Sequence, residues 1–361
     1  MSSFTATDHQ WMTRALRLAE RGAFTTRPNP MVGCVIAQGM QIVGEGWHER
    51  AGEPHAEVHA LRDAGERAKG ATAYVTLEPC GLHGRTPPCV DALIAAGVAR
   101  VVVASADASQ CEGNAAERLR AAGIAVEYGL LQAQARQLNG GFFSRIERGR
   151  PWVRVKLGAS LDGRTAMANG DSKWITGEDS RRDVHLWRAR AGAILTGANT
   201  VLADDPSLTV RFDDERPFVA PLRVVLDPGL ATVARGKLRG GDAPTLYLHA
   251  PDAKPPRELA LQHAPVPAAG GNLDLGAVLK TLAERGVNEV QVEAGATLAG
   301  AFLAGGWVDE LLLYIAPVLL GERARPLFAG LGIDEMAQRM RLQLVESRQI
   351  GADMRLLLRR E

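Results

Sequence analysis

Residue types that zinc prefers as ligands occur at two short segments in the N-terminal part of the chain. His55 and Glu57 are one residue apart, and Cys80 and Cys89 each follow a proline, with eight residues between them. One imidazole and two thiolates leave the fourth tetrahedral position of zinc open. Zinc lowers the pKa of water at such a position from about 15.7 to roughly 7. We expect His55, Cys80 and Cys89 to bind Zn2+, and Glu57 to move protons beside it.

The segments that follow these residues favour helices. Residues 56–68 are predicted to form one, so His55 and Glu57 lie in its first turn, near the positive end of the helix dipole. Pro88 places Cys89 at the start of a second predicted helix, where the thiolate is stabilised. This His-x-Glu and Pro-Cys pattern is the signature of zinc-dependent nucleobase deaminases.

Two alternatives to a zinc deaminase acting on a small molecule remain open. In the first, zinc only stabilises the fold. A closed structural site needs four protein ligands, and the candidates nearby for the fourth ligand are His59 and His83. In the second, the substrate is a nucleic acid. A net charge of +1 and the lack of basic runs beside aromatic residues disfavour that substrate.

The composition indicates a cytoplasmic enzyme with more than one domain. A chain of 361 residues is long enough for two hydrophobic cores. Four cysteines are too few for a disulfide framework and fit a reducing compartment. The N-terminal residues show no signal-peptide pattern, and no apolar stretch is long enough to cross a membrane. We expect a small-molecule substrate and neither a nucleic acid nor a membrane as partner.

Strands and helices are predicted to alternate up to about residue 127. The order β-β-α-β-α-β-α-β predicts a three-layer α/β/α sandwich. Ligands on such sheets bind at the carboxyl ends of the strands, where residues 78–80 fall. The predicted helices are 8–21, 56–68, 90–96 and 115–122, and the predicted strands are 31–37, 41–47, 71–77, 100–104 and 124–127.

A domain boundary is predicted within the charged, Gly- and Pro-containing segment 145–151. We assign residues 1–147 to the deaminase domain and 148–361 to a second α/β domain. Segments 214–221, 227–244 and 250–272, rich in Pro, Gly, Ala and Asp, are interpreted as surface connections. The predicted strands are 153–157, 193–197, 222–226, 245–248, 289–293, 310–315 and 355–359, and the predicted helices are 180–191, 275–285 and 298–305.

Polar residues of the second domain lie in segments that are predicted to be strands and tight turns rather than irregular loops. Residues 156–164 form a strand that enters a glycine turn, residues 172–176 place an indole between two hydroxyls, and residues 200–211 hold two adjacent carboxylates and an arginine. Residues 293–298 predict a strand-to-helix turn whose free N–H groups suit a phosphate. Each segment alone is also compatible with ordinary packing or capping.

Taken in order, these segments resemble the bifunctional deaminase/reductase family of riboflavin biosynthesis over nearly the whole chain. The matching segments are 26–33, 54–60, 76–80, 84–89, 156–166, 174–176, 193–195, 200–211 and 292–295. The resemblance implies a cytidine-deaminase-like N-terminal domain and a dihydrofolate-reductase-like C-terminal domain. It also implies a homodimer or a larger homo-oligomer.

The resemblance implies two reactions and two cofactors, Zn2+ and NADPH. The first is deamination of a diaminopyrimidinone that carries a phosphoribosylamino group, with Glu57 as the proton-transfer residue. The second is reduction of the ribosyl group to a ribityl chain by NADPH. Family positions imply substrate contacts from Asn29, Arg85, Ser172, Arg188, Leu208, Arg211 and Glu293. They imply NADPH contacts from Gly158, Trp174, Thr200, Asp204, Gly295, Ala296, Thr297, Leu298, Ala299, Gly300 and Ala301.

Two positions of the deaminase domain depart from the family pattern. Leu82 stands where the family has a histidine in the zinc loop, and Ser109 stands where it has an asparagine. These departures leave a further alternative open, in which the reductase works and the deaminase domain is weakened or accepts a variant substrate.

Overall fold

The computed structural model describes residues 4–82, 87–107, 109, 114–233, 236–241, 243–256 and 262–360. Contacts divide the chain into two compact units. The first unit comprises Met1–Arg148 together with Pro217–Val219, and the second comprises Gly149–Arg216 together with Ala220–Glu361. Among the described residues, no helix is long and apolar enough to cross a membrane.

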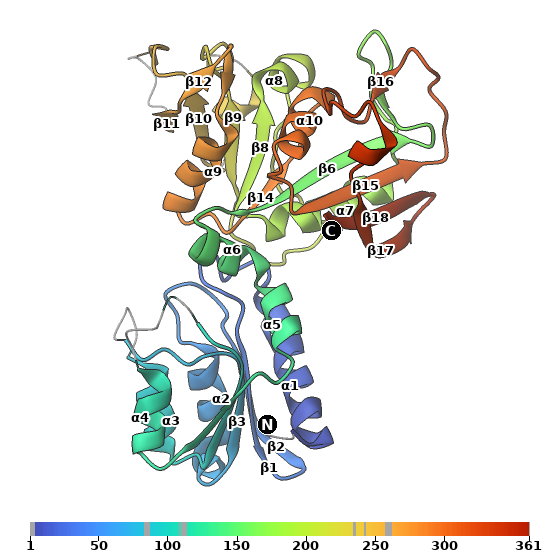
Figure 1. Cartoon of the computed structure of the whole chain (residues 1–361). Coiled ribbons are helices and arrows are strands. Elements are labelled where there is room, and N and C mark those ends of the chain that lie inside the picture. The colour runs from blue at the N-terminus through green and yellow to red at the C-terminus, as the bar shows by residue number, and fades with distance from the viewer. Residues whose placement is uncertain are drawn as a thin grey trace. The chain divides into compact units, whose positions relative to one another are not determined.

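The first unit is built on a five-stranded sheet of order β2-β1-β3-β4-β5 (Figure 1). Strand β1 pairs antiparallel with β2 and β3, whereas β3, β4 and β5 are parallel. The strands are β1 (Gly33–Gln38), β2 (Gln41–Trp47), β3 (Thr72–Leu77), β4 (Arg100–Ser105) and β5 (Ala125–Tyr128). The helices are α1 (Ala6–Ala19), α2 (Ala56–Ala64), α3 (Cys89–Ala96), α4 (Ala115–Ala121), α5 (Gln132–Leu138) and α6 (Gly140–Arg148).

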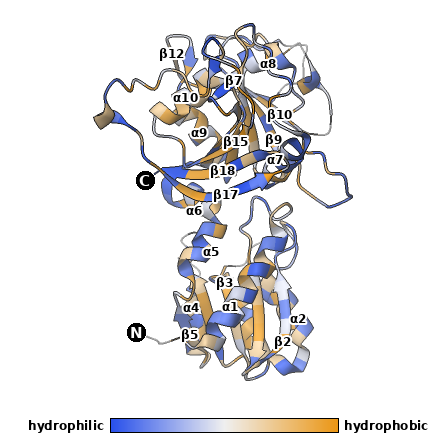
Figure 2. Cartoon of the chain, turned by 90° about the vertical axis from the view of Figure 1, so that its right-hand side faces the viewer, coloured by the Kyte–Doolittle hydropathy of each residue, from blue (hydrophilic) through white to orange (hydrophobic). Residues whose placement is uncertain are grey.

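Helices cover both faces of this sheet because successive side chains of a strand point to opposite faces. Cys34 and Ile36 of β1 are fully buried on the face covered by α2, α3 and α4. Val35 and Ala37 pack on the other face, against α1 and α5. Figure 2 shows the apolar colour on the strands between the helix layers. The predicted three-layer α/β/α sandwich is confirmed.

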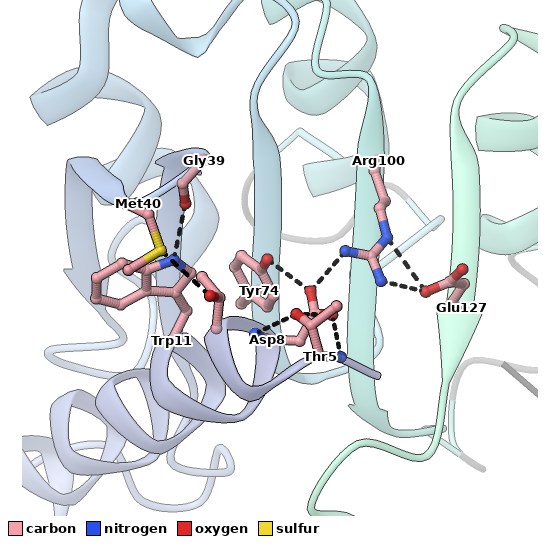
Figure 3. Close-up of polar contacts among 9 residues, drawn as sticks. Thr5, Asp8, Trp11, Gly39, Met40, Tyr74, Arg100 and Glu127 are labelled. Atoms are coloured by element: carbon pink, nitrogen blue, oxygen red, sulfur yellow. Dashed lines mark hydrogen bonds and ion pairs between the residues drawn. The ribbon is translucent and has the colours of Figure 1, made fainter. Parts of the chain in front are cut away.

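A buried carboxylate ties the start of α1 to the sheet (Figure 3). Asp8 closes a capping box with Thr5, and it also accepts hydrogen bonds from the Tyr74 hydroxyl at 2.8 Å and from Arg100 Nη1 at 2.6 Å. Burial raises the pKa of Asp8, but the hydrogen bonds from Arg100, Thr5 and Tyr74 outweigh it and hold the pKa well below the usual value. Arg100 also pairs with Glu127 of β5.

The second unit contains a nine-stranded sheet of order β11-β10-β9-β8-β14-β6-β15-β18-β17. Its strands are β6 (Trp152–Ser160), β8 (Ala193–Gly197), β9 (Leu222–Leu226), β10 (Thr245–His249), β11 (Gln262–Pro265), β14 (Glu289–Val292), β15 (Glu310–Ala316), β17 (Leu342–Ile350) and β18 (Asp353–Arg360). Two small strand pairs add β7 (Arg164–Ala166) with β16 (Arg325–Pro326), and β12 (Ala268–Ala269) with β13 (Asn272–Leu273). In this order, neighbouring strands from β11 through β10, β9, β8, β14 and β6 to β15 are parallel. Strand β18 pairs antiparallel with β15, and β17 pairs antiparallel with β18 at the edge of the sheet.

Helices also cover both faces of the second sheet. Helices α9 (Leu275–Glu284) and α10 (Ala296–Ala304) pack on one face, in a core that includes Leu195 and Val292. The other face packs against α7 (Glu178–Arg190) and α8 (Ala198–Asp204). Parallel strands flanked by helices on both faces match the α/β architecture expected for the C-terminal domain.

Most predicted elements are present, and the differences have physical causes. Helix α6 continues to Arg148, so the charged residues expected in a linker are the last turn of an amphipathic helix. Strand β11 lies in segment 250–272, which was wrongly interpreted as a surface connection throughout. It pairs with β10 at the edge of the sheet, where a strand needs no continuous apolar run. Strand β17 was missed for the same reason, since most of its residues are exposed.

Candidate active sites

The predicted zinc ligands converge in the first unit. The ligand atoms of His55, Cys80 and Cys89 all lie within 4.8 Å of one another. His55 Nδ1 is 3.2 Å from Cys89 Sγ and 3.5 Å from Cys80 Sγ. His55 is the N-cap of α2, Cys89 is the first residue of α3, and Cys80 follows the carboxyl end of β3. One nitrogen and two sulfurs at this spacing fit a tetrahedral zinc ion with an open position.

The surroundings of the two thiols favour a thiolate. The pKa of Cys80 is lowered to about 4, chiefly by hydrogen bonding from the Cys89 thiol and further by His55 and the Cys89 backbone N–H. The same interaction and burial raise the pKa of Cys89. The pair therefore loses its first proton easily and retains the second, and a bound cation would take the place of that second proton.

Glu57 lies beside these ligands in the first turn of α2. Its side chain is buried at 3% exposure, and burial raises its pKa above the ordinary value for glutamate. It interacts electrostatically with His55, Cys80 and Cys89. A buried carboxyl with a raised pKa beside a metal site can both accept and return a proton near neutral pH.

His48 is a residue of this site that the sequence analysis missed. It is 2% exposed, and its ring meets the His55 ring edge to face, with the centroids 5.2 Å apart. Its Nε2 lies 3.1 Å from Asn29 Nδ2, and its Nδ1 lies 3.3 Å from the carbonyl oxygen of Pro54. Burial lowers the pKa of His48 and so favours the neutral ring. The sequence signal was a histidine directly after a predicted strand and seven residues before a ligand.

The other deaminase-domain positions are only partly described. Arg85, the predicted phosphate contact, lies outside the described residues, as does His83. Leu82 is exposed, at 44%. The Ser109 hydroxyl and backbone N–H both donate to Asp107 Oδ1, at 2.6 Å and 2.9 Å, so this serine caps its own loop.

A buried charge cluster forms on the sheet of the second unit. Arg188 of α7 donates two hydrogen bonds to Glu293, each 2.7 Å long, and Gln291 donates a third at 2.9 Å. Strand register places Lys156 of β6 next to Glu293, because their preceding residues, Val155 and Val292, are partners. The Lys156 ammonium lies 5.7 Å from the centroid of the Tyr314 ring.

The charged side chains of this cluster shift one another's pKa values. Burial alone raises the pKa of Glu293, but Arg188 and then Lys156 outweigh it and lower the pKa to about 2. Burial lowers the pKa of Lys156; Glu293 opposes that shift and Arg188 adds to it. His185, which the sequence analysis missed, accepts a hydrogen bond from the backbone N–H of Arg211 at 3.1 Å. Burial, Arg188 and Arg211 lower its pKa to about 4.

The predicted cofactor residues lie near the carboxyl ends of the parallel strands. Helix α8, which contains Thr200 and ends at Asp204, follows β8, and α10 begins directly after Gly295. The starts of the two helices approach closely, since a Cβ at Gly197 would lie 3.3 Å from Leu298. Two helix N-termini after parallel strands fit the phosphates of a dinucleotide, and α10 contains or adjoins the predicted contacts 295–301.

The remaining predicted residues differ in exposure. Trp174 is 69% exposed, with the Arg181 guanidinium 4.5 Å from its ring centroid, and Ser172 lies two residues before it. A Cβ at Gly158 would lie 3.2 Å from Thr176, so the absence of a side chain at Gly158 allows the segment that contains Thr176 to pack closely against β6. Leu208, by contrast, is 3% exposed and packs in a core cluster.

Comparisons with known proteins cover both units. Residues 5–105 match the cytidine and deoxycytidylate deaminase zinc-binding region, and residues 151–356 match the RibD C-terminal domain. The chain is 50% identical to the riboflavin biosynthesis protein RibD of Escherichia coli, over 96% of this chain and 97% of the relative. For the RibD of Haemophilus influenzae the identity is 44%, over 99% and 98%.

Solved structures agree with this assignment over the full chain. Acinetobacter baumannii RibD in form 1 superposes with a TM-score of 0.90 at 43% identity and covers 98% of this chain and 99% of its own. The deaminase/reductase of Thermotoga maritima gives a TM-score of 0.86 at 31% identity, with the same coverage. The chain therefore belongs to the RibD family of bifunctional riboflavin-biosynthesis enzymes, in which a zinc-dependent deaminase domain precedes an NADPH-dependent reductase domain.

Proposed function

We propose that the first unit deaminates a diaminopyrimidinone that carries a phosphoribosylamino group. The observation that carries this proposal is the convergence of His55, Cys80 and Cys89 beside the buried Glu57. Zinc held by these three residues supplies an activated water as the nucleophile. The net reaction replaces the C–NH2 group of the ring by C=O and releases ammonia. The Thermotoga maritima protein, at 31% identity, is a diaminohydroxyphosphoribosylaminopyrimidine deaminase by name, which supports this substrate class.

In this proposal Glu57 moves the protons and Asn29 holds the pyrimidine. Glu57 accepts a proton from the attacking water and delivers it to a ring nitrogen. It then takes the second proton from the hydroxyl now bonded to the ring carbon and passes it to the departing amine, as the C–N bond breaks and C=O forms. Burial raises the pKa of Glu57, which makes its carboxylate a stronger base toward the attacking water. Arg85 is proposed to bind the substrate phosphate, for which a bidentate guanidinium has the right geometry.

The second unit is proposed to reduce the ribosyl group of the deaminated product to a ribityl chain. NADPH supplies the hydride. Ser172, Leu208, Arg211, Arg188 and Glu293 are proposed to bind the substrate, and Lys156 to contribute its charge near the reacting carbon. The buried Arg188–Glu293 pair supports this placement, since its two hydrogen bonds fix both side chains at the carboxyl end of β14.

The contacts to NADPH are proposed to come from three segments. Gly158 and Trp174 are proposed to contact the cofactor from β6 and the segment that follows it, and Thr200 and Asp204 to contact it from α8. Residues 295–301 are proposed to bind its phosphates with the free N–H groups of α10. We also propose that residues 1–147 and 148–361 are the two functional domains; the contact-based division after Arg148 supports this boundary.

The decisive experiment is single-turnover ammonia release by the zinc-loaded protein with NADPH omitted. We expect release from the diaminopyrimidinone ribosyl phosphate, and loss of that release in Glu57→Gln. The matched control is NADPH oxidation by the same variant on the already deaminated compound, which should remain normal. No release by the unsubstituted protein, with normal NADPH oxidation, would contradict the proposed deaminase.

We propose that the chain forms a homodimer or a larger homo-oligomer through β17. This strand is the edge of the nine-stranded sheet, and Leu344 and Val345 on it are 53% and 37% exposed. A long exposed edge with apolar side chains is a site where another strand can pair. Light scattering should give a multiple of the 38.6 kDa chain mass, and Leu344→Glu should reduce it. An unchanged mass in Leu344→Glu would place the contact elsewhere.

We propose that the enzyme works in the cytoplasm. Cys80 and Cys89 are free thiols in the structure, and both must stay reduced to bind zinc. Protein expressed with an export signal and recovered from an oxidising compartment should therefore contain less zinc per chain than protein from the cytoplasm.

A further inference from the structure

The direction of the Asn29 amide is decided by His48. The Pro54 carbonyl oxygen can only accept a hydrogen bond, so the His48 Nδ1 that lies 3.3 Å from it must carry the proton. Nε2 faces Asn29 Nδ2 at 3.1 Å, and an amide NH2 can only donate, so Asn29 donates this hydrogen bond and Nε2 accepts it.

We propose that His48 is a positioning residue for deamination, which fixes the Asn29 amide so that its carbonyl oxygen is presented to the pyrimidine as an acceptor. This inference rests on the proposed contact between Asn29 and the pyrimidine. Without His48, rotation of the amide by half a turn would exchange its donor and acceptor. The pyrimidine would then meet the NH2 group of Asn29, a donor, at the place where it needs the carbonyl oxygen as an acceptor.

The surroundings of His48 make it a rigid support. Its backbone N–H donates to the Val32 carbonyl at 2.8 Å, and its side chain is 2% exposed. Asn29 is held independently by a backbone hydrogen bond to Thr26 at 2.9 Å. Since Pro54 directly precedes His55, one imidazole links the loop that carries Asn29 to the segment that carries the metal ligand.

The test compares variants that keep or lose one hydrogen bond. In His48→Gln the side-chain oxygen can reach the former Nε2 position and accept from Asn29, so deamination should stay within about 3-fold of the unsubstituted protein. His48→Asn is too short to reach Asn29, and His48→Phe keeps the ring but has no acceptor. Both should raise the KM of deamination by roughly 10-fold, an effect typical of a misplaced binding group.

A double-mutant cycle with Asn29→Ala separates action through Asn29 from a direct effect. Asn29→Ala should also cost roughly 10-fold in deaminase kcat/KM, and Asn29→Ala/His48→Phe should lose about 10-fold rather than about 100-fold. Zinc per chain and reductase activity on the deaminated compound should remain unchanged in every variant. These two readouts show that the chain is folded and the metal site intact.

Each other outcome has a defined meaning. Additive losses in the cycle, or loss of zinc in parallel with activity, would overturn the inference, because His48 would then act on the substrate directly or through His55. A silent Asn29→Ala in an active enzyme would overturn it together with the Asn29 contact. Failure of the unsubstituted protein to release ammonia would instead refute the proposed deaminase itself.

Discussion

At the scale of single residues, the second unit depends on a charge pair that is nearly removed from water. Arg188 and Glu293 have side-chain exposures of 14% and 12%, so each is costly to leave without its partner. We expect Glu293→Gln to lower reductase kcat/KM by about 100-fold or more, the effect of losing about 3 kcal/mol. NADPH oxidation on the deaminated compound measures this.

A matched control for that variant exists on the same strand. Glu289 of β14 pairs with Arg154 at 3.3 Å, away from the proposed site, and Arg154 also contacts Glu310 at 2.6 Å, so Glu289→Gln removes a partly buried carboxylate charge without leaving its arginine unpaired. It should leave reductase kcat/KM within a few-fold. Equal losses in the two variants, tracking a common fall in melting temperature, would mean that Glu293 acts only on stability.

His185 makes the stability of the second unit depend on pH. Its pKa falls from 6.5 to about 4 on folding, so the unfolded chain binds the proton more readily. The stabilisation from the neutral ring is fully present above pH 6.5 and is lost as the pH falls toward 4. A shift of this size corresponds to about 3 kcal/mol. Urea unfolding measures the free energy of unfolding at pH 7.5 and at pH 5. The difference between these two values should be smaller for His185→Gln than for the unsubstituted protein. His9→Gln, at an exposed position, should leave the difference unchanged.

At the scale of elements, the zinc site depends on how closely α2 approaches β2. A Cβ at Gly46 would lie 2.4 Å from the Ala56 carbonyl oxygen, and one at Gly44 would lie 2.2 Å from that of Ala60. Gly46→Ala must therefore push the start of α2 away from the sheet, and with it His55 and Glu57. We expect loss of zinc and at least a 10-fold loss of ammonia release, because a misplacement of about 1 Å can cost 100-fold.

Zinc per chain, measured by elemental analysis, checks this expectation. Gly229→Ala is the control, since a Cβ there meets no atom within 4 Å. Reductase activity should persist in both variants. Full zinc occupancy with unchanged ammonia release in Gly46→Ala would show that α2 can move without disturbing its first turn.

The carboxylate of Asp8 should decide whether α1 stays attached to the first sheet (Figure 3). Asp8→Asn keeps the size of the side chain but removes the charge that Arg100 requires, which should cost about 2–3 kcal/mol of local stability. Because folding lowers the pKa of Asp8, its contribution is present above pH 3.8 and is lost as the pH falls below that value.

Hydrogen exchange at neutral pH measures the attachment of α1. Protection of α1 and β4 should fall in Asp8→Asn. Protection should fall less in Glu127→Gln, because Glu127 is 32% exposed and Arg100 would keep its ion pair with Asp8. Equal protection in Asp8→Asn and the unsubstituted protein would show that apolar packing alone holds the helix.

At the scale of the whole molecule, each unit has its own core and its own site, so the two activities should be separable. Removal of zinc with a chelator should abolish ammonia release and leave NADPH oxidation on the deaminated compound within about 2-fold. Added Zn2+ should restore the first activity. Parallel loss of both activities would show that the reductase depends on the metal site.

The sequence was sufficient for much of the zinc site and for the central elements. Cys80 and Cys89 were predictable because the residue types define the metal chemistry, and their prolines and helix starts define where the ligands point. Buried strands such as β1 and β4 were predictable from continuous apolar runs. Strands β11 and β17 were not, because an edge strand is held by its neighbour rather than by its own hydrophobicity.

What only the tertiary structure decided is which side chains from distant segments meet. Composition and motifs determined the α/β class, the zinc chemistry and the family resemblance, since these depend on residue types at short spacing. The pairing of His48 with Asn29, and of Arg188 with Glu293, depends on strand order and loop paths that no local pattern encodes. Hydrogen bonds act only over about 3 Å, so such partners become visible only once the whole chain is folded.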